Sequence, residues 1–298
     1  MFMLELLTTE ETAAYLRLSE RKLYELVAAG AVPCSKVTGR WLFPKAALDR
    51  WVASGLPDGL KSLEESAPAI VGGSTDPLLE WALRESGSGL ASLPEGSEAG
   101  LRRLARREIM VAAIHLHALE AADPSTANID AVAHAPGLHD AVVIGFARRE
   151  QGLLVAPGNP HGIEDLPQVA SRKLRVAQRQ EGAGAQLLLR LLLAEAKLTT
   201  RDIKPVHPVC ATGTDLAQAI RAGHADCGIA TRAAAQAAGL DFVPLVWENF
   251  DLVLRQRDYF LPGPSALFGF FRSDRFRQRA GELGGYDLTV CGAIRLVA

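Results

Sequence analysis

The sequence contains no run of about 18 uninterrupted apolar residues, so it predicts no transmembrane helix. Its opening residues, MFMLELLTTEE, also lack the basic stretch that begins a secretory signal peptide, because acidic residues directly follow the short apolar run. We therefore expect a cytoplasmic protein with no membrane partner.

Cysteine and metal-ligand patterns are equally sparse. The four cysteines are far apart and form no CxxC pair: Cys34, Cys210, Cys227 and Cys291. Reduced thiols are the simpler expectation for a cytosolic chain, although the spacing leaves disulfide pairing open. His115 and His117 are the one close histidine pair in the sequence, and no third ligand at metal-site spacing accompanies them. We expect neither a protein-bound metal cation nor a cofactor.

Catalytic signatures are missing as well. There is no GxSxG nucleophile motif, no Walker loop and no metal triad, and GAG at 182–184 is a weak nucleotide signal. These absences argue against an enzyme. The net charge of −2 provides no overall attraction to nucleic acid, so DNA binding would need a local patch. The length of 298 residues favours two or three domains.

Residues 1–53 show two capped helical patterns separated by a tight turn. Thr8 or Thr9 can cap the first helix, and acidic residues follow in its first turn, where the helix dipole favours them. Ser19 can cap the second helix, and Gly30 is expected to end it in a left-handed conformation. The two helices are close enough in sequence to pack against each other.

A hairpin and a third helix are expected after these two helices. Two short alternating runs around Thr38 and Gly39 predict a β-hairpin, and Pro44 is expected to begin a helix. Basic and polar side chains on the second helix and the hairpin could reach a major groove and the DNA backbone beside it. The candidate DNA-binding residues are Ser19, Arg21, Lys22, Tyr24, Lys36 and Arg40.

This order of elements, carried by LTTEETAAYLRLSERKLYELVAAGAVPCSKVTGRWLFPKAALDRW, resembles the winged helix-turn-helix of excisionase and MerR-like proteins. The resemblance implies a module that binds double-stranded DNA; a small protein-interaction module is the alternative. Residues 1–53 hold seven Lys/Arg against six Asp/Glu, so one module should bind weakly. A homodimer on a repeated half-site would compensate.

The remainder of the chain predicts an α/β domain behind a linker. Residues 54–68 are rich in serine, glycine, proline and charge, and they are expected to connect two domains. Strands and helices alternate over residues 69–298, which favours mainly parallel sheets. The expected strands are 69–73, 109–115, 141–147, 152–157, 174–179, 227–230 and 242–247.

Three strand-to-helix junctions in this domain carry small or hydroxyl residues. They are GGSTDPLLEWAL, RQEGAGAQLLL and ATGTDLAQAI, and SGSGLASL at 86–93 adds a further polar loop. The free amides and positive dipole of a helix N-terminus suit an anion. Any one junction could be plain capping, but three in one domain predict a shared binding cleft.

The order of these features resembles the type II periplasmic-binding-protein fold of molybdate-binding proteins and LysR-type effector domains. GSTDPLLEWAL, REQGLLVAPGNP, AGHADCGIA and GLDFVPLVWENFDLV look like a bacterial family of binding-protein-like domains that often follow an excisionase-type helix-turn-helix. The resemblance implies two lobes that the chain crosses between twice, lobe I at about 69–146 and 254–298 and lobe II at about 147–253.

The resemblance also implies where a ligand binds. Ser74 and Ser88 match hydroxyl positions that hold an oxyanion in molybdate-type binders, and His115 matches a histidine that faces the cleft. The candidate ligand-binding residues are Ser74, Thr75, Ser88, His115, Arg179, Gly182, Gly184, Thr212 and Thr214.

These expectations combine into a one-component transcription regulator that senses a small anion. Hydroxyls and helix amides suit molybdate or tungstate, while Arg179 leaves open a small organic acid or a phosphorylated metabolite. A cytosolic binding protein or an enzyme is the remaining alternative. The expected partners are DNA, the anion and a second copy of the chain.

Overall fold

The computed structural model describes residues 5–37, 39–54, 66–117 and 124–298. The chain divides into two compact units, Met1–Ser66 and Ala67–Ala298. Most of the linker expected at 54–68 lies outside the described residues, as does Thr38 of the expected hairpin. Across the described ranges, no helix has the length and apolar character needed to cross a bilayer.

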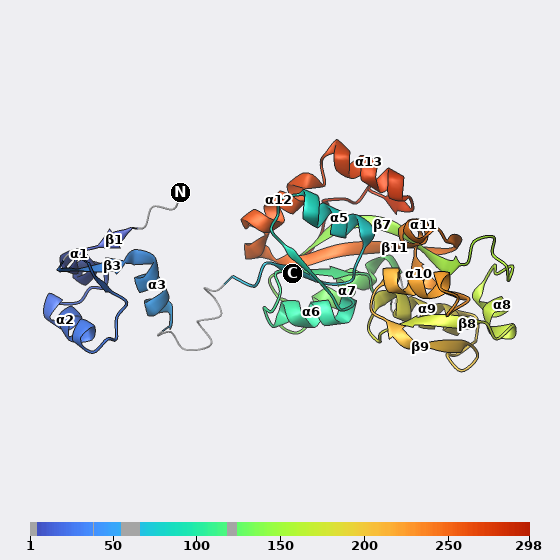
Figure 1. The fold of residues 1–298 in the computed structure, drawn as a ribbon, viewed down its shortest axis with the longest axis horizontal. Coiled ribbons are helices and arrows are strands. Elements are labelled where there is room, and N and C mark those ends of the chain that lie inside the picture. The colour runs from blue at the N-terminus through green and yellow to red at the C-terminus, as the bar shows by residue number, and fades with distance from the viewer. Residues whose placement is uncertain (1–4, 38, 55–65, 118–123) are drawn as a thin grey trace. The chain divides into compact units, whose positions relative to one another are not determined.

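The first unit packs short helices against a three-stranded antiparallel sheet of order β1-β3-β2 (Figure 1). Its elements are β1 (Leu6–Leu7), α1 (Thr9–Tyr15), α2 (Glu20–Ala28), β2 (Ser35–Val37), β3 (Arg40–Pro44) and α3 (Lys45–Ser54). Its core includes the fully buried side chains of Leu23, Phe43 and Leu48, one each from α2, β3 and α3. The winged helix-turn-helix expected from the sequence is confirmed.

Local capping sets the helix boundaries in this unit. Thr8 and Glu11 form a reciprocal capping box at the start of α1, and Ser19 Oγ accepts a hydrogen bond from the Lys22 amide at 3.3 Å. Gly30 follows α2 with φ +63°, as expected for a left-handed end. Pro44 ends β3 instead of beginning α3, because it still pairs with β1 opposite Leu6. The third helix therefore begins one residue later than predicted.

The second unit is built on one mixed sheet of order β5-β4-β6-β11-β7-β10-β8-β9, with β12 and β13 also paired to β7. Its elements are β4 (Ile70–Gly73), α5 (Pro77–Glu85), β5 (Ala91–Pro94), α6 (Ser97–Ala105), β6 (Val111–Ile114), η1 (Pro124–Thr126), α7 (Ala127–Ala133), β7 (Ala141–Val155), α8 (Leu166–Ser171), β8 (Arg175–Arg179), α9 (Gly184–Glu195), β9 (Lys204–Cys210), α10 (Gly213–Arg221), β10 (Cys227–Thr231), α11 (Arg232–Ala238), β11 (Asp241–Arg255), η2 (Gln256–Phe260), α12 (Pro262–Phe270), α13 (Asp274–Leu283), β12 (Tyr286–Asp287) and β13 (Ile294–Val297).

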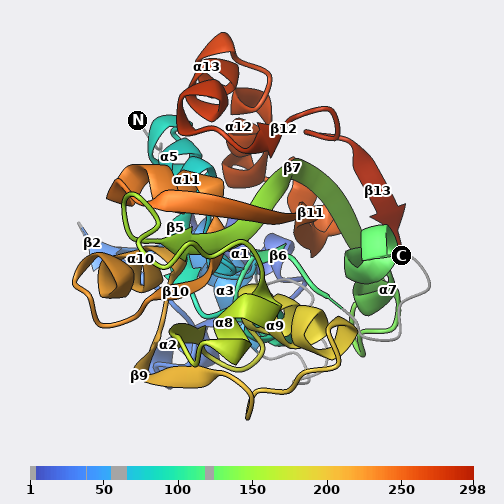
Figure 2. The ribbon, with the colours of Figure 1, turned by 90° about the vertical axis from the view of Figure 1, so that its right-hand side faces the viewer.

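Two long antiparallel strands, β7 and β11, run through the middle of this sheet and join its two halves (Figure 2). On one side lie β4, β5 and β6, which are parallel to one another, and we call this half with its helices lobe I. On the other side lie β8, β9 and β10, likewise parallel, which form lobe II. The two-lobed fold expected from the sequence is confirmed.

The strand predictions need correction in two places. The strand expected at 242–247 continues to Arg255 as β11, and the expected strands 141–147 and 152–157 are a single strand, β7. The polar residues between them pair with β11 throughout, with Arg149 opposite Glu248 and Gln151 opposite Val246. Arg149 and Gln151 are buried although they are polar. This middle part of the strand therefore lacks the apolar pattern that marks its two ends. The prediction also missed β5, β9, β12 and β13, which are short or interrupted by proline.

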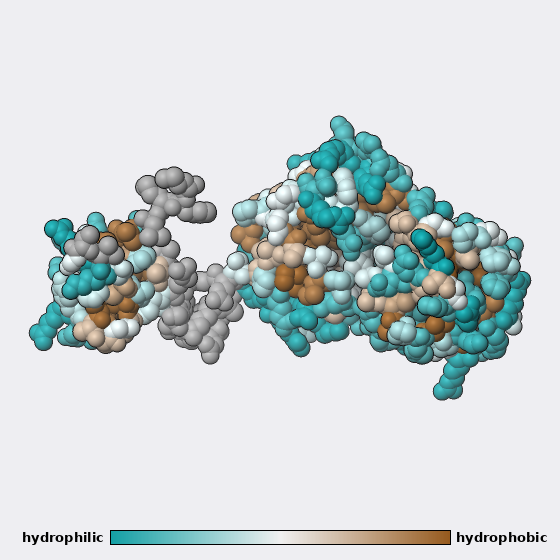
Figure 3. All heavy atoms as spheres, viewed as in Figure 1, coloured by the Kyte–Doolittle hydropathy of each residue, from teal (hydrophilic) through white to brown (hydrophobic). Residues whose placement is uncertain are grey.

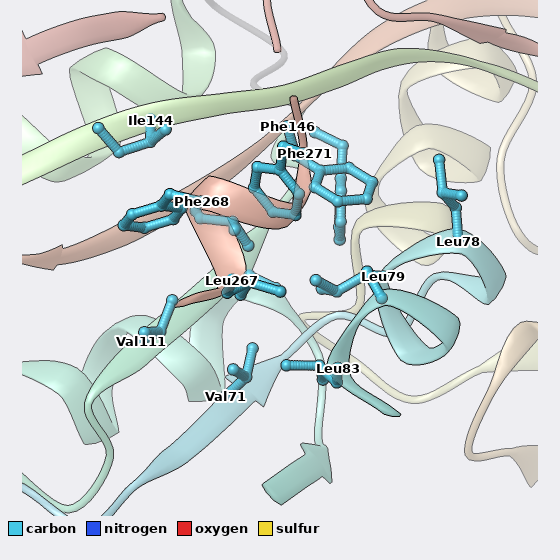
Figure 4. Packing of buried hydrophobic residues seen from close by; sticks show 14 of the residues in the cluster. Val71, Leu78, Leu79, Leu83, Val111, Ile144, Phe146, Leu267, Phe268 and Phe271 are labelled. Carbon is cyan, nitrogen blue, oxygen red and sulfur yellow. The ribbon is translucent and has the colours of Figure 1, made fainter. Parts of the chain in front are cut away.

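Lobe I has an aromatic core beneath α5, α12 and α13 (Figure 4). The ring of Phe146 on β7 meets those of Phe250, Phe271 and Phe276 nearly edge-on, with centroids 5.5, 5.2 and 5.7 Å apart. The opposite face of the sheet is covered by α6, whose buried leucines pack near β4 and β6. The outer surface over α13 is hydrophilic (Figure 3).

Two helical glycines of lobe I allow a matched test of this packing. A Cβ on Gly100 of α6 would lie 2.7 Å from the Cα of Gly73 in β4, whereas a Cβ on Gly281 of α13 would meet nothing within 4 Å. We expect Gly100→Ala to lower the free energy of unfolding by about 1–3 kcal/mol through overpacking. Gly281→Ala should raise it by roughly 0.5–1 kcal/mol, the gain in helix propensity. Urea unfolding measures both, and an equal effect of the two substitutions would contradict the close contact of α6 with β4.

Candidate ligand-binding cleft

A small cavity lies between the two lobes, beside the middle of the crossing strands. Lobe I contributes Thr75, Asp76, Pro77, Glu80 and His115, and lobe II contributes Arg179, Ala185, Gly213, Thr214, Ala230, Thr231 and Ala234; Arg149 and Gln151 come from β7. Its volume is about 30 Å³. This space suits a compact polar ligand more than a large apolar one.

Helix N-termini from both lobes point toward this cavity. Asp76 caps α5 by accepting hydrogen bonds from the amides of Leu78 and Leu79 at 2.9 and 3.1 Å. Thr212 caps α10, whose first two residues line the cavity, and the second residue of α9 lines it as well. Because each of these helices has nine or more residues, their dipoles add positive potential to the cavity.

A fully buried arginine forms the floor of the cleft. Arg149 donates from Nε to Glu248 Oε1 at 2.7 Å and from Nη1 to Asp76 Oδ2 at 2.9 Å. Its guanidinium lies 3.9 Å from the ring centroid of Phe250. The Tyr286 hydroxyl lies 3.0 Å from both oxygens of Asp76. One cation therefore connects the start of α5 in lobe I to both crossing strands.

Electrostatic interactions keep Glu248 and Arg149 charged although both side chains are buried. Burial would raise the pKa of Glu248, but the hydrogen bonds of His115 and His117 and the charge of Arg149 hold it well below its usual value. Burial likewise opposes the charge on Arg149, yet Glu248 and Asp76 raise its pKa above the ordinary arginine value. Burial and then the Asp76 carboxylate raise the pKa of Tyr286 well above its usual value, so its hydroxyl remains a donor.

His115 is held rigidly at the edge of the cavity. Ser97 Oγ accepts from the His115 amide at 3.0 Å and donates to its carbonyl at 3.1 Å, and Gly184 packs against the imidazole. Burial lowers the pKa of His115 to about 4, so the ring is neutral at pH 7. Its Nδ1 lies 3.0 Å from the Glu248 carboxylate, and Nε2 of His117 lies 2.7 Å from the same group.

Arg179 differs from Arg149, because within the described residues it forms no ion pair with a carboxylate. Its Nε donates to the Cys210 carbonyl at 3.1 Å and its Nη2 to the Ala211 carbonyl at 2.8 Å. Partial burial lowers its pKa to about 10, so it remains a cation at neutral pH. Among the described residues, Asp215 is the carboxylate that acts on this charge, and it does so without forming an ion pair with Arg179.

Four of the residues predicted from the sequence line the cavity: Thr75, His115, Arg179 and Thr214. Neither Ser74 nor Ser88 is among the residues that line it. Ser74 is buried with its hydroxyl 2.8 Å from that of Ser97, and Ser88 Oγ accepts a hydrogen bond from the Leu90 amide within its own loop.

The other three predicted residues do not line the cavity, but they belong to the same two strand-to-helix junctions as residues that do. Thr212 caps α10, as described above. Gly184 is required by its contact with His115, since a Cβ there would lie 2.0 Å from the histidine carbonyl oxygen. Gly182 has φ +79° and packs against Glu98 of lobe I.

Sequence reasoning missed the acidic and amide residues that surround Arg149. Asp76, Gln151 and Glu248 are separated by tens of residues, and pattern analysis detects local spacing only. One signal was present: the run RREQ stands between two strongly apolar segments, and a charged run that continues a strand indicates buried pairing. Polar residues between two apolar segments equally favour a break between two strands. That break was predicted, and the structure shows one continuous strand instead.

The predicted DNA-binding side chains lie on the exposed surface of the first unit. The side chain of Arg21 is 91% exposed and that of Lys22 57%, and both lie near Glu25 on the same helix. Tyr24 is exposed on α2, and Ser19 just precedes it. On the hairpin, Lys36 and Arg40 are exposed, with Lys36 Nζ 5.2 Å from the Trp41 ring centroid.

Family comparisons agree with both units. Residues 6–55 match the model described as a helix-turn-helix domain, and residues 79–272 match that of the PBP superfamily domain. The chain belongs to the PBP superfamily domain family. A helix-turn-helix domain joined to a PBP superfamily domain is the architecture of a ligand-responsive transcription regulator, and both domains resemble regulators and binding proteins.

Individual relatives are distant. The chain is 21% identical to YvgK of Bacillus subtilis (strain 168) over 97% of both chains. It also resembles an H2O2-bound mutant of Corynebacterium glutamicum OxyR, with a TM-score of 0.52 and 15% identity over 93% of this chain and 89% of that one. A putative phosphate ABC transporter substrate-binding protein with bound phosphate from Clostridium perfringens gives a TM-score of 0.52 and 11% identity over 73% and 98%. These structural similarities show the fold of this PBP superfamily member.

The importance of the buried arginine can be tested against its neighbour. Arg149→Met would leave Asp76 and Glu248 buried without their cation, so we expect it to lower the free energy of unfolding by about 3–5 kcal/mol. Arg148→Met removes the same charge from an exposed position of the same strand and should cost less than about 1 kcal/mol. Urea unfolding of both variants measures the difference; similar values would show that the buried network does not hold the lobes.

Proposed function

We propose that this PBP superfamily protein is a transcription regulator that binds a small anion in the cleft between its lobes. Anion binding changes the affinity of its helix-turn-helix domain for DNA. The protein acts as a homodimer on DNA in the cytoplasm, because two weakly charged modules are needed for useful affinity.

The observation that carries the proposal is the Arg179 cation without a carboxylate partner in the cavity wall, as far as the described residues extend. Its two hydrogen-bond acceptors are backbone carbonyls, which cannot neutralise its charge. An anion beside it would gain charge-assisted hydrogen bonds in a partly desolvated site. The N-termini of α5, α9 and α10 add positive potential from both lobes, so the same anion would favour a closed arrangement of the lobes.

Two named structural relatives support an anionic ligand class. One is the Clostridium perfringens protein with bound phosphate. The other is the sulfate-binding protein SubI from Mycobacterium tuberculosis H37Rv, with a TM-score of 0.50 and 14% identity over 73% of this chain and 85% of that one. Because both likenesses concern the fold, they support the class and not one anion.

The ligand choice can be narrowed by one acceptor in the cavity. Gln151 lines the cavity and is buried, and its Oε1 has no hydrogen-bond partner among the described residues. Its Nε2 donates to Glu248 at 2.9 Å, which fixes the orientation of the amide. An acceptor left unpaired in a buried site favours a ligand that carries its own donor. Hydrogen phosphate, a phosphorylated metabolite or a hydroxy acid has such a donor, whereas molybdate and tungstate lack one at neutral pH.

Thermal stabilisation tests whether anions that carry a hydrogen-bond donor bind better than those that lack one. We expect saturating phosphate or a small hydroxy acid to raise the melting temperature of the full chain more than molybdate, tungstate or sulfate does. Arg179→Met should remove the effect, since it deletes the cation that contacts the anion, while Arg190→Met on the exposed surface of α9 should retain it. Equal stabilisation of the two variants would place the anion elsewhere. A larger shift with molybdate would favour the tetrahedral oxyanion over the donor-bearing ligand.

The DNA-binding proposal has a separate test. Arg21→Ala together with Lys22→Ala should abolish the gel shift with the protein's own upstream DNA, because both cations lie on the exposed face of α2. Anion-induced stabilisation should remain. The double variant Arg275→Ala/Arg277→Ala removes the same charge from α13 and should bind DNA normally. DNA binding that survives in the first variant, or is lost in both, would contradict this interface.

In this function the bound ligand undergoes no chemical change. We expect mass spectrometry to recover the ligand unchanged after prolonged incubation with the protein.

A further inference from the structure

Three potential metal ligands converge at the point where lobe I meets the crossing strands. His115 and His117 follow the end of β6, and Glu248 lies in β11, more than 130 residues later in the chain. Their ligand atoms all lie within 4.8 Å of one another. His115 also lines the cavity that holds Arg179, whereas His117 and Glu248 do not.

The spacing of these atoms fits a bound ion. Nδ1 of His115 lies 3.0 Å and Nε2 of His117 lies 2.7 Å from the Glu248 carboxylate. Two ligand atoms of one tetrahedral ion, each at about 2.1 Å, are about 3.4 Å apart. An ion could therefore replace the two histidine–carboxylate hydrogen bonds if each pair of ligand atoms moved apart by about 0.4–0.7 Å.

The surrounding contacts orient these side chains. Glu248 Oε1 accepts from Arg149 Nε and Gln151 Nε2, so Oε2 is directed toward His117. Ser97 fixes the backbone of His115 on both sides, and the two imidazole rings stand at 88° with centroids 6.1 Å apart. Outer partners of this kind hold metal ligands in place in known sites. All three ligand side chains are less than one-tenth exposed.

We propose that His115, His117 and Glu248 bind one divalent transition-metal cation of the Zn²⁺ class. Two imidazoles and one carboxylate form a mixed nitrogen and oxygen set that suits Zn²⁺, and a fourth position remains for water. The ion connects the end of β6 to β11. It therefore stiffens the junction about which the lobes would move.

The direct test is a titration of the full-length, chelator-treated chain with Zn²⁺ alone, followed by calorimetry. We expect saturable binding of one ion per chain. His117→Gln should weaken it by at least about 100-fold, since losing even an outer partner can cost as much. The matched control is His161→Gln, because His161 lies 3.6 Å from Asp226 in an exposed histidine–carboxylate pair. Equal binding by wild type and His117→Gln, loss in His161→Gln, or no saturable binding would overturn the proposal.

Co²⁺ gives a second readout that needs no variant. Bound Co²⁺ should produce visible absorption that one equivalent of Zn²⁺ removes, and circular dichroism should show that His117→Gln is folded. If that variant is unfolded, the absorption decides: a band abolished by Zn²⁺ supports the site, and no band overturns it.

Discussion

The ion pairs of Arg149 with Asp76 and Glu248 are the interaction on which the cleft depends. Asp76 caps α5 in lobe I, Arg149 lies on β7 and Glu248 on β11, so three separate elements meet at one guanidinium. A buried ion pair does not stabilise a fold more than apolar packing would, but breaking it leaves uncompensated charges. We infer that it specifies the register of the crossing strands beside the cavity, where Gln151 accompanies it.

The two arginines of the cleft differ in their hydrogen-bond partners. Arg149 pairs with two carboxylates, whereas Arg179 donates to backbone carbonyls and is the residue that we propose contacts the anion. Arg149 holds the floor of the cleft in place, and Arg179 provides a positive charge in the wall that lobe II forms. A ligand between them would contact both lobes, which is how its binding energy could favour one lobe arrangement.

Much of the fold could be predicted from the sequence because its signals are local. The caps at Thr8 and Ser19, and the glycine that ends α2, depend on a few neighbouring residues. Arg179 and Thr214, which line the cavity, were predicted as ligand-binding residues because each lies at a strand-to-helix junction. The network around Arg149 could not be found in this way, because its partners lie 73 and 99 residues away. The hydroxyl of Ser88 accepts a hydrogen bond within its own loop, a use that sequence spacing does not reveal.

Coupling between the cleft and DNA is the central claim, and fluorescence anisotropy of the full chain on its upstream DNA tests it directly. DNA affinity would be measured with and without saturating hydrogen phosphate, under conditions where phosphate raises the melting temperature. We expect the dissociation constant to change by at least about 5-fold, the lower end of typical allosteric coupling. An unchanged DNA affinity with phosphate bound would contradict the account.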